Sequence, residues 1–212
     1  MNEYKLNYIR EKILEKHYFK DKNDGFFVDI GSYDGIEHSS TYLFEKKGWK
    51  GVCCDPIPEI FSKLMENRPN SSNINCAVTK YDYRIPFILN KGYTNIISGV
   101  EEYYNPRKRD SEINIKGGFY DIIKVISHPL QKILDHINVY KIDYLTISTE
   151  GSEFSILQSI DFDKTYIDII DFVDLDPKVT NNCVTFLKSK GYKYESRVDG
   201  SIIMIKEDSS YN

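Results

Sequence analysis

The stretch FVDIGSYDG, Phe27–Gly35, joins an apolar run to a polar segment that contains two glycines. The apolar part has the composition of a buried strand, and Asp29 lies at its end. Ligands of open parallel sheets bind at the carboxyl ends of the strands, where a glycine such as Gly31 lets the backbone approach a ligand closely. The stretch therefore predicts a ligand-binding loop that follows the first strand of a sheet.

Strand and helix patterns alternate along the rest of the chain. Strands are expected at residues 26–30, 51–54, 74–78, 142–148, 166–175, 192–198 and 201–206. Helices are expected at 1–24, 37–47, 128–137, 152–159 and 181–190, and residues 55–69 should form a loop and a helix with Pro58 in its first turn. Repeated strand–helix units predict an α/β fold with a mostly parallel seven-stranded sheet and helices on both faces. Asp199-Gly200 between two apolar runs predicts a tight hairpin, so the sheet should end in an antiparallel pair.

One region departs from this alternation. Residues 80–127 contain one extra candidate strand, RIPFILN, followed by loops with short irregular elements. We expect this region to be a variable insertion that contributes to substrate specificity. Its tyrosines Tyr93, Tyr103 and Tyr104 are candidates for stacking on a sugar.

The composition limits the classes of function. The chain has 212 residues, 41% of them hydrophobic and 28% charged, with a net charge of −4. This charge argues against broad nucleic-acid binding, and we expect the basic cluster Arg107–Arg109 to be a solvated loop. No apolar run reaches the ~18 residues of a membrane span, and a cytoplasmic location is expected. None of the four cysteines has the spacing of a zinc or redox motif, so buried free thiols are expected.

The acids at the strand ends indicate the type of ligand. The spacing of Gly31 and Gly35 is not that of a dinucleotide fingerprint, and no P-loop lysine follows. Carboxylates would repel a phosphate but suit S-adenosylmethionine, which carries an ammonium, a sulfonium and a ribose. Asp29 and Asp34 are candidates for the ammonium, and Asp55 at the end of the second strand is the candidate for the ribose hydroxyls. The alternative is that these acids cap turns and helices.

Three segments together resemble a known family. They are residues 27–64, FVDIGSYDGIEHSSTYLFEKKGWKGVCCDPIPEIFSKL; residues 75–79, NCAVT; and residues 145–162, LTISTEGSEFSILQSIDF. In this combination the chain resembles the FkbM-type methyltransferases, which use S-adenosylmethionine. The resemblance implies a single Rossmann-like methyltransferase domain over residues 1–212. It also implies O-methylation of a small-molecule or glycan hydroxyl, with a carbohydrate or nucleotide-sugar as first expectation.

The resemblance also implies roles for individual residues. The residues that match cofactor-binding positions of the family are Asp29, Gly31, Ser32, Tyr33, Asp34, Gly35, Thr41, Asp55, Pro56, Ile57, Cys76, Ala77 and Thr149. Ile57 would lie against the adenine, and the backbone at Cys76-Ala77 would reach its edge. Asp55 stands where the family more often has Glu.

Two departures from the family pattern affect the reaction centre. Ser148 occupies the position of an aspartate in the family's Asp-x-Glu-Gly motif, and Asp174-Leu175-Asp176 stands where Glu-His-Asn is common. Hard cations need several oxygen ligands together, so no metal site is expected. The same departures leave open which residue is the general base.

Three residues are candidates for the catalytic centre. Glu150 is the first candidate for the base, although an acid here would also suit the start of the following helix. Asp174 is the second candidate, as base or acceptor ligand, and Ser148 is a candidate for holding water or the acceptor. For His38 and His128 a structural or surface role is favoured. Two alternatives stay open: a catalytically impaired module that binds S-adenosylmethionine, and an NAD-dependent oxidoreductase.

Overall fold

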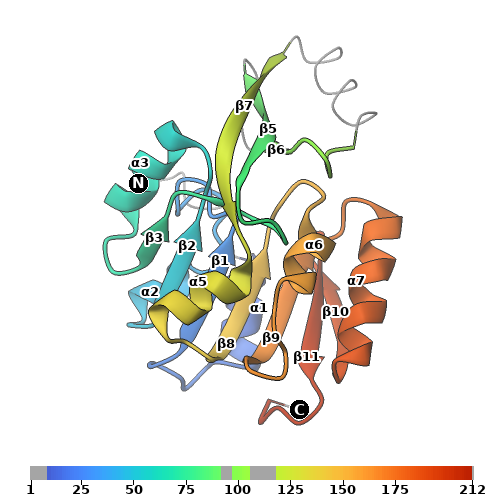
Figure 1. Cartoon of the computed structure of the whole chain (residues 1–212). Coiled ribbons are helices and arrows are strands. Elements are labelled where there is room, and N and C mark those ends of the chain that lie inside the picture. Colours follow the sequence, from blue (N-terminus) through green and yellow to red (C-terminus); the bar gives the residue numbers. More distant parts are fainter. Residues whose placement is uncertain (1–8, 92–96, 106–117, 212) are drawn as a thin grey trace.

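A computed structural model describes residues 9–91, 97–105 and 118–211 of the chain (Figure 1). Its main sheet has seven strands in the order β10-β11-β9-β8-β1-β2-β3. Their bounds are β1 Phe26–Ile30, β2 Lys50–Cys54, β3 Ser72–Ile74, β8 Lys141–Ile147, β9 Tyr166–Val173, β10 Tyr192–Val198 and β11 Ser201–Lys206. The strands β1, β2, β3, β8 and β9 run parallel to one another, and β11 is antiparallel to both β9 and β10. The sequence predicted a mostly parallel seven-stranded sheet with a closing antiparallel hairpin, and the main sheet is a mixed sheet of seven strands.

The closing hairpin forms where the sequence predicted it. Asp199 and Gly200 have φ angles of 48° and 75°, and both central residues of a type I′ turn require positive φ. β11 returns from this turn into the space between β9 and β10.

A second sheet of four strands lies over one end of the main sheet (Figure 1). It consists of β4 Ala77–Val78, β5 Arg84–Lys91, β6 Gly99–Val100 and β7 Phe119–His128, in the order β4-β7-β5-β6. The strand expected at residues 74–78 is thus wrong as a single element, because residues 72–74 pair in the main sheet and 77–78 in the second. The loops expected up to residue 127 are also wrong for residues 119–127, because β7 pairs antiparallel with β5 along its length. Pairing with a distant strand, not local composition, determines this part of the fold.

Six helices are described: α1 Ile9–His17, α2 Tyr42–Lys46, α3 Pro58–Asn67, α5 Leu130–Ile137, α6 Glu153–Gln158 and α7 Pro177–Ser189. The first expected helix ends at His17 and not at residue 24. The helix expected from residue 37 begins only at Tyr42, because His38 has a φ of 57° and Asp34 accepts hydrogen bonds from the turn that precedes it. α7 begins four residues before the expected 181, because Asp176 caps it by accepting from two backbone N–H groups.

Both faces of the main sheet are covered by helices. On one face, side chains of α5, α6 and α7 pack against strand residues that include Val28 and Leu145. On the other face, side chains of α1, α2 and α3 pack against Phe27 and Tyr144. Successive strand residues point to opposite faces, so Phe27 and Val28 belong to different cores. All four cysteines are buried and free, as expected.

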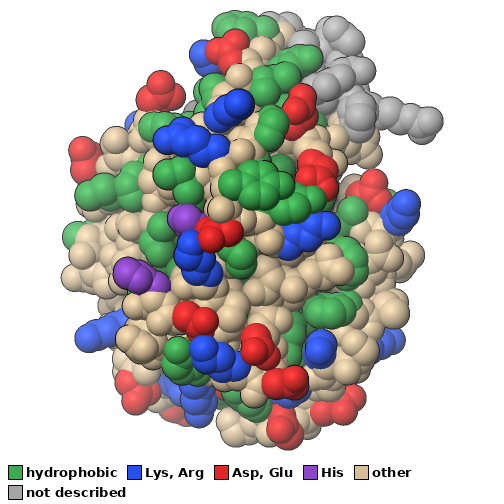
Figure 2. All heavy atoms as spheres, viewed as in Figure 1, with side chains coloured by type: hydrophobic (Ala, Val, Ile, Leu, Met, Phe, Trp, Pro, Cys, Tyr) green, Lys and Arg blue, Asp and Glu red, His purple; other side chains and the backbone are tan. Residues whose placement is uncertain are grey.

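The described parts of the chain bear on two sequence predictions, which concern membrane spans and surface charge. No helix there is long and apolar enough to cross a bilayer. Acidic and basic side chains are interspersed over the described residues of the face seen in Figure 2. Arg107–Arg109 and Tyr93, about which the sequence made predictions, lie outside the described residues.

Candidate functional site

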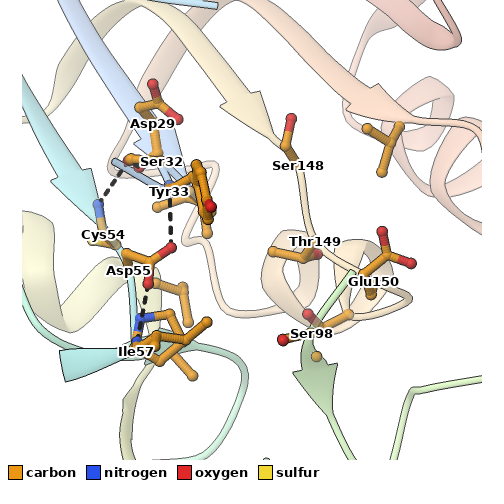
Figure 3. Close-up of a pocket in the computed structure, with 18 of the residues that line it drawn as sticks. Asp29, Ser32, Tyr33, Cys54, Asp55, Ile57, Ser98, Ser148, Thr149 and Glu150 are labelled. Atoms are coloured by element: carbon orange, nitrogen blue, oxygen red, sulfur yellow. Dashed lines mark hydrogen bonds between the residues drawn. The ribbon is translucent and has the colours of Figure 1, made fainter. Parts of the chain in front are cut away.

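A cavity of about 250 Å³ lies where the carboxyl ends of the central strands meet the second sheet. Its walls include Ile30 of β1, Cys54 of β2 and Val173 of β9, together with Phe87 of β5. Figure 3 shows that the loops after β1 and β2 face the turn after β8 across this space. The cavity is therefore at the sheet edge to which the sequence assigned a ligand.

The loop after β1 is held against both neighbouring strands. Gly31 has a φ of 82°, and a Cβ there would lie 2.2 Å from the carbonyl oxygen of Ser148. Ser32 donates from its hydroxyl to the Asp29 carbonyl at 2.7 Å and accepts from the Cys54 N–H at 3.1 Å. Only glycine fits at position 31, and the loop is fixed as one wall of the cavity.

Asp55 presents a fixed carboxylate to the same cavity. It is 5% exposed, and its two oxygens accept from the N–H groups of Tyr33 at 3.1 Å and Ile57 at 2.9 Å. Burial raises the pKa of Asp55 to about 7, although these two hydrogen bonds oppose the shift. Each oxygen keeps a second lone pair, so the carboxylate can still accept hydrogen bonds from a pair of ligand hydroxyls.

Asp29 lines the cavity from a more buried position. It is 3% exposed and accepts from the Thr41 hydroxyl at 2.6 Å. Burial raises the pKa of Asp29, and the nearby positive charge of Arg68 opposes the shift. Thr41 itself is fully buried and is not among the lining residues; it also accepts from Arg68 at 3.0 Å. Thr41 thus orients Asp29 and does not face the cavity directly.

Asp34 and Gly35, two other candidates for cofactor binding, are not among the lining residues. Asp34 accepts from the N–H groups of Ile36 at 2.9 Å and Glu37 at 2.7 Å, so its carboxylate closes the turn before α2. Gly35 has a φ of 82° and packs against the side chain of Arg68. The remaining cofactor candidates Tyr33, Pro56, Ile57, Cys76, Ala77 and Thr149 all line the cavity.

The turn after β8 forms the opposite wall. Ser148, Thr149 and Glu150 line the cavity, and Figure 3 shows Ser98 beside this turn. The turn is held by Glu153, whose carboxylate accepts from the Thr149 hydroxyl at 2.9 Å and the Gly151 N–H at 3.2 Å.

Glu153 lies within the family-like segment 145–162, but the sequence predicted no role for it. It is 2% exposed, and burial raises its pKa to about 7. The signal available in the sequence was its position at the start of α6, where an acid can bond back to the preceding turn.

The structure separates the two candidate bases. Glu150 faces the cavity, whereas Asp174 is not among the lining residues. Asp174 accepts from the Thr180 hydroxyl at 2.6 Å and pairs with Arg197 at 3.0 Å. Its neighbour Leu175 does line the cavity.

The two histidines also differ in position. His38 lines the cavity, whereas His128 is not among its lining residues and lies 2.6 Å from Asp82. In the described parts of the chain, no group of three or more His, Cys, Asp or Glu side chains is arranged to hold a metal ion.

Several lining residues had no role in the sequence analysis. They are Arg10, Glu37, Ser39, Ser40, Val78, Phe87, Ser98, Gly99, Val100, Ser152 and Val173. Arg10 comes from α1, far from the cofactor motifs in sequence. Phe87, Gly99 and Val100 come from the second sheet, and Ser98 directly precedes β6. No local pattern marks them, because only the tertiary fold brings these segments to the cavity.

The donor set fits S-adenosylmethionine. Asp55 offers a carboxylate to a ribose, and Ile57, Ala77, Phe87 and Val100 offer apolar surface to an adenine. Asp29 and Glu150 add negative charge that suits a sulfonium or an ammonium.

The fold is that of known methyltransferases. The precorrin-6y C5,15-methyltransferase from Geobacter metallireducens GS-15 is 12% identical, with a TM-score of 0.50 over 92% of this chain and 84% of that one. The METTL16 methyltransferase domain is 10% identical, with a TM-score of 0.51 over 94% of this chain and 66% of that one. At such identities the likeness shows the fold alone, and it defines the class as a Rossmann-like methyltransferase fold.

The sequence signature of the methyltransferase FkbM domain matches residues 29–194. The chain therefore belongs to the FkbM methyltransferase family, as the sequence motifs indicated. A search of curated protein sequences returned no significant match. Family membership supports methyl transfer from S-adenosylmethionine as the chemistry of this cavity.

Proposed function

We propose that the protein transfers a methyl group from S-adenosylmethionine to a hydroxyl of a small molecule or glycan, with a carbohydrate or nucleotide-sugar as the first candidate acceptor. The observation that carries this proposal is the placement of Asp55 and Glu150 on opposite walls of one cavity. Asp55 holds the ribose, and Glu150 lies where an acceptor beside the cofactor would be deprotonated. Membership in the methyltransferase family argues against the oxidoreductase alternative.

The proposed reaction is an in-line displacement. The cofactor supplies an activated methyl group on a sulfonium. A Glu150 oxygen would take the proton that the acceptor hydroxyl loses when it is methylated. A base in this position is worth roughly 10²–10⁴-fold in rate. Ser148 accepts from or donates to the acceptor and so helps to orient it.

The second sheet supports a neutral, hydroxyl-bearing acceptor. Ser98, which directly precedes β6 of this sheet, presents a hydroxyl beside Glu150. Gly99 lets this wall come close, since a Cβ there would lie 2.8 Å from the Cβ of Glu150. A hydroxyl and a carboxylate side by side can both hydrogen-bond to the hydroxyls of a sugar or similar polyol.

A second candidate is a module that binds S-adenosylmethionine without turnover. Ser148 and Leu175 replace an aspartate and a histidine that are common in the family, and both line the cavity. The two candidates differ in turnover and agree in cofactor binding.

Calorimetry with S-adenosylhomocysteine and with NAD tests the cofactor. We expect one molecule of S-adenosylhomocysteine and no NAD to bind. Asp55→Ala should weaken this binding, and Asp34→Ala should weaken it less, because only Asp55 faces the cavity. Binding of NAD, or equal effects of the two variants, would contradict the proposed site.

Release of S-adenosylhomocysteine in the presence of a panel of hydroxyl acceptors tests turnover. Glu150→Gln should lower turnover with cofactor affinity nearly unchanged, and the exposed Glu101→Gln serves as the matched control. Normal turnover in Glu150→Gln would remove Glu150 as the base. Cofactor binding without turnover on any acceptor would favour the second candidate.

A further inference from the structure

Arg10 is the one arginine or lysine among the described residues that line the cavity. The walls also carry the acidic side chains of Asp29, Glu37, Asp55 and Glu150 and the imidazole of His38. S-adenosylmethionine, however, carries a carboxylate as well as an ammonium and a sulfonium. Four acids account for the positive groups and the ribose but leave this carboxylate without a partner.

Arg10 is held in place from behind by Asp171. Its Nη1 lies 3.3 Å from each of the two Asp171 oxygens. The same two oxygens accept shorter hydrogen bonds, 2.7 Å each, from the hydroxyls of Tyr144 and Thr146. Charge-assisted N–H···O⁻ bonds are usually about 2.7–2.9 Å long, so the Arg10 contact is a loose one.

The guanidinium also retains unused donor capacity. Arg10 is 9% exposed, and its buried Nε has no hydrogen-bond partner within the described ranges. A guanidinium has five N–H donors in a planar fork that matches a carboxylate. Burial alone would lower the pKa of Arg10, but the negative charge of the adjacent Asp171 contributes to a net rise of the pKa above its ordinary value. The group therefore stays positively charged at any working pH.

We propose that Arg10 binds the carboxylate of the amino-acid part of S-adenosylmethionine and makes α1 part of the cofactor site. The proposal rests on the proposed function, since it assumes that this cofactor occupies the cavity. Asp171 acts as a positioning residue because it contacts the guanidinium and is not among the lining residues, and Tyr144 and Thr146 in turn hold Asp171. The competing explanation is that Arg10 only neutralises the buried Asp171.

Two ligands separate these explanations. S-adenosylhomocysteine has the carboxylate, and its decarboxylated analogue lacks that group alone. We expect the wild-type chain to bind S-adenosylhomocysteine about 10- to 100-fold more tightly than the analogue, the range for a buried hydrogen-bonded charge. Arg10→Met should abolish most of this preference by weakening S-adenosylhomocysteine and leaving the analogue nearly unchanged.

Control variants protect the test from effects on folding. Lys16→Gln removes an exposed positive charge from the same helix and should keep the full preference. Since Arg10→Met leaves Asp171 buried without its cation, the double variant Arg10→Met/Asp171→Asn is measured beside it, with circular dichroism and thermal melting. The preference is the ratio of the affinities for S-adenosylhomocysteine and for the decarboxylated analogue, measured within one protein. This preference should be lost in both the single and the double Arg10 variant.

The outcomes are distinguishable. A preference for S-adenosylhomocysteine that persists in the Arg10 variants, or an equal loss of affinity for both ligands, would overturn the role of Arg10 and leave the proposed function intact. Failure of the wild-type chain to bind either ligand would overturn the proposed function itself.

Discussion

Glu11 provides a quantitative test of how the buried charges of this fold behave. It lies on α1 and is 0% exposed. One carboxylate oxygen accepts from the Leu43 N–H at 3.1 Å, and the other, Oε2, has no hydrogen-bond partner among the residues that the structure describes. Burial raises the pKa of Glu11 from 4.5 to about 7, against the opposing effect of the Leu43 hydrogen bond.

This shift makes stability depend on pH with a defined sign. Between pH 4.5 and 7 the folded chain keeps the Glu11 proton that the unfolded chain has released. The free energy of unfolding therefore falls as the pH rises through this window. Glu11 binds its proton more tightly in the folded chain than in the unfolded chain. Between pH 5 and pH 8 this difference lowers the free energy of unfolding by about 2 to 3 kcal/mol, an order-of-magnitude figure.

Glu11→Gln removes the titration while keeping an oxygen for the Leu43 N–H. We expect the stability of the variant relative to wild type to improve by about 2 to 3 kcal/mol between pH 5 and pH 8. Urea unfolding, followed by fluorescence of Trp49, the single tryptophan, measures both proteins at each pH. Asp55 and Glu153, whose pKa values are also near 7, remain in both proteins and cancel in the difference.

The exposed Glu66→Gln on α3 is the matched control and should show no such change with pH. A difference between Glu11→Gln and wild type that stays constant from pH 5 to pH 8 would refute the reasoning.

Three further predictions follow from buried contacts. Arg68→Met should lower the free energy of unfolding by about 3–5 kcal/mol, because it leaves the buried Glu45 carboxylate, 2.7 Å from the Arg68 Nε, without its positively charged partner. A loss under about 1 kcal/mol in urea unfolding would contradict this. Gly31→Ala should melt at a lower temperature than Gly200→Ala, because both have positive φ but only position 31 would force a Cβ to 2.2 Å from a backbone oxygen, and equal melting temperatures would argue against that contact. Burial raises the pKa of Cys53 to about 12, so a disulfide reagent should modify it only after denaturant is added, and rapid modification of the native chain would show that the thiol is accessible.

The main sheet could be predicted because its signals are local. The apolar run before Asp29 marks a buried strand, and the run around Val52 marks its neighbour. Asp199-Gly200 marks the hairpin, because its residue types suit positive φ. In each of these cases composition, length and turn chemistry agree with the tertiary environment.

The second sheet and part of the cavity could not be predicted in the same way. β7 forms because it pairs with β5, which lies more than 25 residues earlier in the chain. The fold brings Ser98 and Arg10 to the cavity from segments without a cofactor motif. The role of Asp34 was ambiguous for a related reason: the same acid can bind a ligand or close a turn, and only the position of Ile36 and Glu37 distinguishes them.

The placement of β11 has a consequence for biosynthesis. A ribosome makes β11 after β10, yet β11 occupies the position between β9 and β10. Until β11 has been made, β9 has no partner at this edge in the main sheet. The edge of β9 is therefore exposed to strands of other chains until the β10–β11 hairpin docks against it.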